Sequence, residues 1–237
     1  ARKIVKRTIL LFLIGLCSNW LANACGGDLG WSHLRIMGDI GFVFADSPRK
    51  VSYEQAKELS ELLSDAIVPV GVFVNEHIKL IVDLFKDGII EMAQLHGDED
   101  ENYIKNLKAK SLEQTGSEIP VINAIEIRDT DDDADDCDDT EDINYNKRLL
   151  EWRDSVSDYF ILDSGKGSGK TFNWELVDSE ILSKPFFLAG GLNSENLSSA
   201  IEEFNPFAVD LSSSVETDGF KDEEKIKEII EIIENYR

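Results

Sequence analysis

The sequence predicts an α/β fold, a closed (β/α)8 barrel of parallel strands in one domain over residues 1–237. From residue 40 onward, apolar runs of strand length alternate seven times with segments that have apolar residues at helical spacing. A further apolar run near the front of the chain supplies an eighth strand. An open, doubly wound sheet is the alternative, but its usual glycine fingerprint is absent after the first strand.

The front strand is expected in the apolar run TILLFLIGLC, residues 8–17. Its surroundings also resemble a secretory signal, with the basic start RKIVKR and a plausible cleavage point at Ala22-Asn23-Ala24. We favour a strand because the rest of the chain needs one more to close the barrel. The segment from Ser18 to Met37 has a poor helical pattern, so residues 1–37 are expected to form an atypical first β/α unit.

The seven later strand candidates are short runs rich in β-branched and aromatic residues. They cover residues 40–45, 68–74, 91–95, 120–125, 159–162, 185–189 and 207–211. Each is followed by a helical segment. These segments lie at residues 54–63, 78–85, 101–107, 146–156, a short stretch from 174, 197–204 and 226–233. In the segment 78–85, apolar residues at relative positions zero, three, four and seven form one buried stripe.

The last two strand candidates end in small, hydrogen-bonding residues. A helix at 197–204, with Asn193 suited to cap its start, separates them, so the unit should be a parallel crossover. Both turns then lie at the C-terminal edge of the sheet, where backbone N–H groups and hydroxyls can bind an anion. The residues are Gly190, Gly191, Ser212 and Ser213. They predict a phosphate site, although tight turns alone would also explain the pattern.

Composition limits the classes of partner. The formal charge of −23 argues against nucleic acid, because phosphate backbones are bound by clustered Lys and Arg. Ten of the 47 acidic residues lie in one run at residues 129–142, which does not fit an EF-hand and is interpreted as a solvated loop insertion. Three cysteines without metal-ligand spacing leave an odd thiol, which suits a reducing, cytoplasmic compartment without a metal site.

Five ordered motifs make the chain resemble a known family. They are VGVFVN, QLHGDE, GSGKTFNW, FLAGGLNSEN and VDLSSSVETDGFKD. From about residue 41 to the C-terminus, the chain resembles phosphoribosylanthranilate isomerase, a (β/α)8 barrel of tryptophan biosynthesis. The resemblance implies an Amadori rearrangement of N-(5′-phosphoribosyl)anthranilate to 1-(2-carboxyphenylamino)-1-deoxyribulose 5-phosphate, without metal or organic cofactor. It implies a small phosphorylated substrate. We also expect no membrane partner, because the apolar front run is too short to span a bilayer, and a monomer or weak homodimer.

The resemblance also implies roles for individual residues. Asp163 matches the family's general acid, and Arg49 matches the arginine that binds the anthranilate carboxylate. The matched phosphate ligands are the residues of the two turns named above. His96, from QLHG, is a substrate-binding candidate that could instead be a satisfied rim histidine. Asp210 could accept a hydrogen bond from the aniline nitrogen or only pin its own turn.

The chemistry requires an acid for the ribose ring oxygen and a base for the neighbouring carbon. The family's base is a cysteine in a Lys-Ile-Cys-Gly motif at the end of strand one, but here Lys3-Ile4 is followed by Val5. We favour Cys17, at the end of the best strand-like run, because a base must be held on a rigid element. Cys25, which precedes a glycine, is the alternative. The missing motif also favours a second reading, a phosphate-ligand-binding barrel of impaired catalysis.

Overall fold

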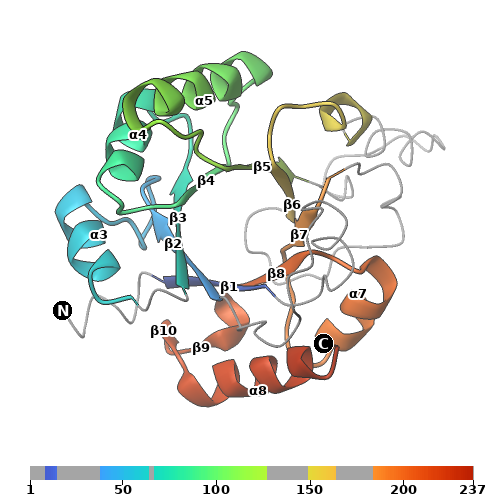
Figure 1. The fold of residues 1–237 in the computed structure, drawn as a ribbon. Coiled ribbons are helices and arrows are strands. Elements are labelled where there is room, and N and C mark those ends of the chain that lie inside the picture. The colour runs from blue at the N-terminus through green and yellow to red at the C-terminus, as the bar shows by residue number, and fades with distance from the viewer. Residues whose placement is uncertain (1–8, 15–37, 64–66, 127–148, 164–183, 237) are drawn as a thin grey trace, which may run out of the picture.

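The chain forms a closed barrel of eight strands that follow one another around the ring in sequence order (Figure 1). The computed structural model describes residues 9–14, 38–63, 67–126, 149–163 and 184–236. The strands are β1 (Ile9–Ile14), β2 (Gly38–Val43), β3 (Ile67–Phe73), β4 (Met92–Leu95), β5 (Val121–Glu126), β6 (Tyr159–Asp163), β7 (Phe186–Leu188) and β8 (Ala208–Leu211). The barrel expected from the alternation of strands and helices is confirmed.

The first strand runs opposite to its predicted direction. β1 pairs antiparallel with β2 and with β8, so that its last residue, Ile14, lies beside Ala208, the first residue of β8. The expectation of eight parallel strands is therefore wrong for β1, which also ends earlier than the predicted run 8–17. A parallel pair needs a crossover between its strands, and residues 18–37 have a poor helical pattern. Antiparallel pairing satisfies the edges of β2 and β8 without that crossover.

Strands β2 to β8 are parallel, and each pairs with the next along the chain. Apolar side chains from strands that are not neighbours pack against one another and therefore fill the barrel interior. These residues are Val70, Ile122, Ile161, Phe187, Ala189 and Ala208. Because side chains alternate along a strand, residues two positions beyond them also point inward, toward the C-terminal end of the barrel. This periodicity places the candidate site.

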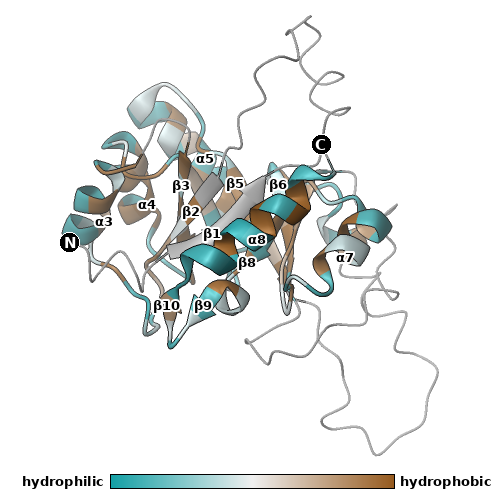
Figure 2. Cartoon of the chain, turned by 90° about the horizontal axis from the view of Figure 1, so that it is seen from below, coloured by the Kyte–Doolittle hydropathy of each residue, from teal (hydrophilic) through white to brown (hydrophobic). Residues whose placement is uncertain are grey.

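Helices cover the outside of the barrel (Figure 1). They are α3 (Tyr53–Ser60), α4 (Ile78–Lys86), α5 (Glu101–Thr115), α7 (Leu197–Phe204) and α8 (Glu223–Glu234). In α8, apolar residues lie along one side and polar residues along the other (Figure 2), and Ile229 and Ile233 are buried against the strands. Asp222 caps this helix by accepting hydrogen bonds from the N–H groups of Glu224 and Lys225. Amphipathicity and capping thus explain where α8 lies and begins.

Most helix predictions are confirmed, with differences at the ends. α5 continues to Thr115, well past the predicted residue 107, and ends at Gly116 in a left-handed conformation. Asn193 caps a turn before α7 rather than the helix itself, because its Oδ1 accepts from the N–H of Glu195 at 2.8 Å. Of the helix predicted at 146–156, the described part is helical at 149–152. The helix expected from 174 and the acidic run 129–142 lie outside the described residues.

A small hairpin follows the turn after β8, and the sequence did not predict it. It comprises a 3-10 turn η4 (Ser213–Val215) and two short antiparallel strands, β9 (Glu216–Thr217) and β10 (Phe220–Lys221). Figure 2 shows β9 and β10 close to the start of α8. Across the described ranges, no helix has both the length and the apolar character that a membrane span requires.

Candidate active site

Polar side chains enter the barrel interior from strands β4, β6 and β8. Asp163 lies two residues beyond the interior Ile161, and Asp210 lies two beyond Ala208. Gln94 follows the interior Met92 in the same way. The strands are parallel here, so these side chains gather at the C-terminal mouth of the barrel, as the sequence predicted for Asp163 and Asp210.

His96 lies beside Asp163. Nε2 of His96 is 3.5 Å from Oδ2 of Asp163, and Nδ1 is 3.1 Å from the amide nitrogen of Gln94. An amide nitrogen can only donate, so Nδ1 accepts and the ring proton lies on Nε2, facing the carboxylate. Gln94 is 1% exposed, and its hydrogen bond to Nδ1 fixes the orientation of the imidazole ring. The structure thus places His96 beside the site residue Asp163 with both ring nitrogens partnered, and its part in substrate binding stays a prediction.

The loop that carries His96 is fixed by a buried carboxylate. Glu99, which is 5% exposed, accepts hydrogen bonds from the N–H of Asn75 at 2.6 Å and from the N–H of Gly97 at 2.8 Å. The N–H of His96 itself donates to the carbonyl of Phe73. The loops after β3 and β4 are therefore tied together, which holds the imidazole on a rigid support.

Asp210 is the most perturbed acid of the described chain. Burial, the largest cause, and the negative charge of Asp163 together raise its pKa to about 8, although Lys221 and Arg49 act in the opposite direction. Its Oδ1 is buried and has no hydrogen-bond partner among the described residues. The carboxyl is therefore protonated at neutral pH, and its Oδ1 does not pin its own turn. This geometry leaves Asp210 able to contact a ligand. Of the two roles that the sequence left open, it is compatible with a hydrogen bond to the aniline nitrogen.

Arg49 stands at the rim, after β2. Its Nη2 lies 3.1 Å from Oε1 and 3.2 Å from Oε2 of Glu216 in β9. The ammonium group of Lys221 lies 3.0 Å from the same carboxylate. Arg49 and Lys221 both act on the pKa of Asp210, so these charges share one mouth with the two aspartates. The structure brings the predicted carboxylate-binding arginine to the predicted site.

The two predicted phosphate turns follow neighbouring parallel strands, β7 and β8. Gly190 and Gly191 adopt positive φ angles of 88° and 67°, which side chains disfavour. The carbonyl of Gly191 accepts from the side-chain amide of Asn196 at 3.0 Å. The N–H groups of both glycines have no hydrogen-bond partner within the described ranges. Ser212 and Ser213 occupy the second turn, so both sets of predicted ligands lie at one edge, and their binding of phosphate stays a prediction.

The sequence of this chain matches a known protein family over most of its length. Residues 36–232 match the family model described as N-(5′-phosphoribosyl)anthranilate (PRA) isomerase. The chain belongs to the PRA isomerase family. It is similar to the PRA isomerase of Streptococcus mutans, with 40% identity over 195 residues that cover 82% of this chain and 86% of that protein. The family predicted from the five motifs is confirmed.

Solved PRA isomerase structures share the fold. The crystal structure from Thermotoga maritima is similar with a TM-score of 0.65 and 34% identity, covering 83% of this chain and 88% of that one. A structure of PRA isomerase in complex with reduced 1-(o-carboxyphenylamino)-1-deoxyribulose 5-phosphate is similar with a TM-score of 0.63 and 32% identity, covering 83% and 87%. These likenesses confirm the predicted (β/α)8 barrel class.

Both cysteines proposed as the base lie near the start of the chain. Cys17 and Cys25 are outside the described residues and precede the part of the chain that matches the PRA isomerase model. The direction of β1 also removes the reason for preferring Cys17. Its last residue, Ile14, lies beside Ala208 at the barrel end opposite Asp163, so this strand end does not lead to the catalytic mouth.

Sequence reasoning missed Gln94, Glu216 and Lys221 as individual site residues. Gln94 lies within QLHGDE, and the other two lie within VDLSSSVETDGFKD, so the PRA isomerase motifs contained them. Their contacts could not be read from the motifs, because Arg49 and Glu216 are 167 residues apart. The charge pattern did contain a signal, because Glu216 and Lys221 lie on either side of the turn Asp218-Gly219.

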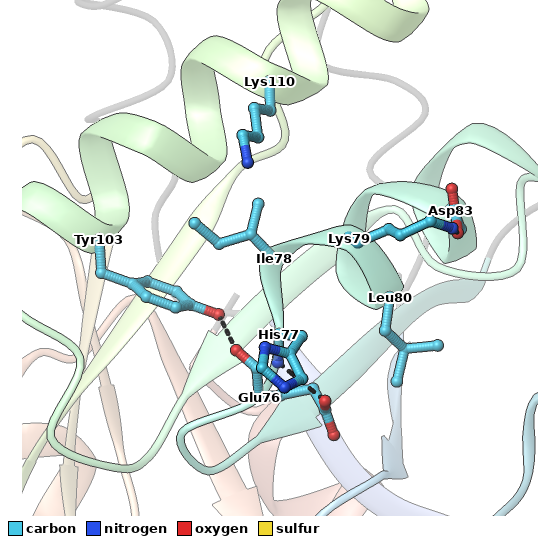
Figure 3. A pocket seen from close by; sticks show the side chains of 8 residues that line it. All are labelled: Glu76, His77, Ile78, Lys79, Leu80, Asp83, Tyr103 and Lys110. Carbon is cyan, nitrogen blue, oxygen red and sulfur yellow. Dashed lines mark hydrogen bonds and ion pairs between the residues drawn. The ribbon is translucent and has the colours of Figure 1, made fainter.

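A separate hollow of about 670 Å³ lies on the outer surface, beside α4 and α5 (Figure 3). Its lining residues are Glu76, His77, Ile78, Lys79, Leu80, Asp83, Tyr103 and Lys110. The hydroxyl of Tyr103 donates to the carbonyl of Glu76 at 2.6 Å (Figure 3). None of the residues predicted for PRA isomerase chemistry lines this hollow, so it is not the candidate active site.

Proposed function

We propose that the chain catalyses the Amadori rearrangement of N-(5′-phosphoribosyl)anthranilate to 1-(2-carboxyphenylamino)-1-deoxyribulose 5-phosphate, a step of tryptophan biosynthesis. Family membership supports this assignment. The observation that carries it is the shared barrel mouth of Asp163, Asp210 and Arg49, whose charges act on one another. The N–H groups of Gly190 and Gly191, which have no partner among the described residues, lie at the same edge and suit a phosphate.

The reaction is an internal redox exchange, in which C2 is oxidised and C1 is reduced, so it needs an acid and a base but no external oxidant or reductant. An acid protonates the ribose ring oxygen while the nitrogen lone pair forms the C1=N bond and the C1–O bond breaks. A base then removes the proton from C2, and its electron pair forms the C1=C2 bond as the C1=N electrons return to nitrogen. The resulting enolamine loses its O–H proton and gains one at C1, which gives the ketone.

Asp163 is the proposed acid. It stands at the end of β6 with His96 on one side and interacts electrostatically with Asp210. The pKa of Asp210 is raised to about 8, so the pair of aspartates holds a proton, on Asp210, at neutral pH. The pair then supplies that proton to the ring oxygen through Asp163, while Asp210 stays within hydrogen-bond reach of the substrate's nitrogen.

The remaining groups bind the substrate. Arg49 offers a planar guanidinium to the anthranilate carboxylate. The turns after β7 and β8, through Gly190, Gly191, Ser212 and Ser213, bind the phosphate. His96 orients the substrate beside Asp163. A cysteine among the first 25 residues is the proposed base. Because β1 runs in the reverse direction, Cys17 is no longer preferred over Cys25 for this role.

A turnover assay tests this proposal. Substrate is generated enzymatically from anthranilate and phosphoribosyl pyrophosphate, and its disappearance is followed by fluorescence. We expect turnover by the parent chain and a loss of at least about 100-fold in kcat for Asp163→Asn, the range that general acid catalysis supplies. The variant should still bind a reduced product analogue. Turnover unaffected by Asp163→Asn would exclude Asp163 as the acid.

A second function, a phosphate-ligand-binding barrel of impaired catalysis, is favoured by one observation. The family's base should be held at the mouth of the barrel. The last residue of β1, Ile14, lies instead at the opposite end, beside Ala208. This barrel would bind the reduced product analogue but show no turnover. Cys17→Ser and Cys25→Ser separate the two functions further, because only an isomerase with a cysteine base loses activity in one of them.

We further propose a cytoplasmic enzyme that is a monomer or a weak homodimer. Small phosphorylated metabolites and free thiols are typical of that compartment. Among the described residues, four large apolar side chains are well exposed, and they belong to separate segments of the chain. They are Leu62, Val74, Leu112 and Leu150. Four exposed apolar side chains from separate segments do not by themselves indicate the large contiguous patch of an obligate dimer. Sedimentation at micromolar concentration measures the mass.

A further inference from the structure

We propose that Glu216 is a positioning residue, which holds the guanidinium of Arg49 in place for the carboxylate of the substrate. The inference rests on the proposed function and adds a residue to which that function gave no role. Its basis is the contact between β9 and the loop after β2, two segments distant in sequence, at the rim of the candidate site.

Glu216 contacts only one edge of the Arg49 guanidinium. Nη2 donates to both oxygens of Glu216, at 3.1 and 3.2 Å. Those are the only hydrogen bonds of the guanidinium to other described residues, and they leave Nη1 and Nε for a second acceptor. A guanidinium carries five N–H donors in a rigid plane, so one carboxylate can fix the plane while a second binds another edge.

Glu216 is itself held firmly. Its side chain is 11% exposed, and Lys221, which is 9% exposed, lies 3.0 Å from it. Lys221 also donates to the carbonyl of Ser212 at 2.8 Å, in the turn proposed to bind phosphate. Lys225 donates to the backbone carbonyl of Glu216 at 2.7 Å. The carboxylate therefore links the arginine to the phosphate turn through a fixed set of contacts.

The charges favour positioning over a simple surface ion pair. Arg49 and Lys221 bring two positive charges to one carboxylate, so the cluster keeps a net positive charge that an incoming carboxylate can neutralise. An exposed ion pair would contribute little to stability. Glu216 and Lys221 are largely removed from water, and a buried pair is favourable only when its geometry is well fixed. Without Glu216, the long side chain of Arg49, which is 36% exposed, would lose its fixed orientation.

The test compares two ligands that differ in one group. The first is the reduced product analogue with its anthranilate carboxylate, and the second is the same compound with an unsubstituted phenyl ring. For Glu216→Gln we expect affinity for the first to fall by about tenfold or more, the effect of one well-placed charged hydrogen bond. Affinity for the second should stay within about twofold of the parent. In turnover, KM should rise more than kcat falls.

Asp218→Asn is the matched control. It removes one negative charge from the same hairpin, at an exposed turn residue with a positive φ angle that asparagine tolerates. We expect this variant to bind both analogues as the parent does. Circular dichroism and thermal unfolding establish that each variant is folded. If Glu216→Gln does not fold, Glu216→Asp, which withdraws the carboxylate by one methylene, carries the same prediction.

A double-mutant cycle isolates the coupling. In the background of Arg49→Gln, Glu216→Gln should cause no further loss of affinity for the carboxylated analogue. Equal losses for both analogues, or unchanged affinity for both, would overturn the positioning role while leaving the isomerase proposal in place. A parent chain that binds neither analogue and shows no turnover would contradict the isomerase proposal itself and the inference with it.

Discussion

Asp210 is the side chain whose surroundings most constrain the chemistry of the barrel mouth. Burial and the nearby Asp163 raise its pKa to about 8, so at neutral pH it is a hydrogen-bond donor rather than a charged acceptor. The sequence could name this residue but could not assign its protonation. That property depends on how deeply the barrel buries the carboxyl and on charges supplied by β6, β10 and the loop after β2.

This pKa predicts how stability depends on pH. A folded-state pKa above the unfolded value means that the native state binds more protons, so the Asp210 contribution to the free energy of unfolding falls as pH rises from about 4 to about 8. The slope is roughly 1.4 kcal/mol per pH unit over that window. Asp210→Asn should remove this component. Urea unfolding of both proteins at several pH values between 5 and 8 measures the difference, and parallel curves would show that Asp210 titrates normally.

The Glu216–Arg49 contact shows why some site residues escape sequence reasoning. In the sequence, Glu216 is one acid among 47, and its partner is 167 residues away. Only the fold brings the rim of β2 next to the hairpin after β8. Arg49 could be named because the motifs shared with PRA isomerase imply a carboxylate-binding arginine after the second strand, a role that suits a planar cation.

Strands β2 to β8 were predictable because strands buried on both faces appear in the sequence as continuous apolar runs between polar turns. The direction of β1 was not. An apolar run such as residues 9–14 carries no information on strand direction, and direction follows from the connection to the next strand. The hairpin β9–β10 was also missed, because two-residue strands leave no periodic signal.

Closure of the barrel by β1 leads to a stability prediction. Leu11 pairs with Ile40 of β2 and with Leu211 of β8, so proline at this position would remove an N–H from a strand that has a neighbour on each side. We expect Leu11→Pro to destabilise the fold by about 1–3 kcal/mol, the cost of a buried backbone group left without its hydrogen-bond partner. Thermal unfolding checks this value. Glu223→Pro, at the first position of α8 where no N–H bond is lost, is the control and should leave the melting temperature nearly unchanged.

If Leu11→Pro unfolds at the same temperature as the parent, β1 does not contribute to the closed barrel. The mouth built from β4, β6, β7 and β8 does not depend on that outcome. Its residues belong to strands that pair with one another in parallel from β2 to β8.

The whole molecule is strongly acidic, although its proposed substrate is an anion. Deleting residues 129–142 removes ten of the 47 acidic residues and brings the formal charge from −23 to −13. In the parent chain, kcat/KM should rise with added salt, because screening weakens the repulsion that slows arrival of the substrate. The deletion should weaken that salt dependence. Stopped-flow turnover between about 20 and 300 mM salt spans the range over which the Debye length shortens markedly. An unchanged dependence would show that the run does not affect the substrate's approach.

The most direct test of the site is a crystal structure of the full chain with the reduced product analogue. We predict the phosphate against the N–H groups of Gly190, Gly191 and Ser213, the sugar beside Asp163 and the carboxylate at Arg49. An analogue bound elsewhere, such as the hollow beside α4 and α5, or a sugar turned away from Asp163, would contradict the proposed isomerase site.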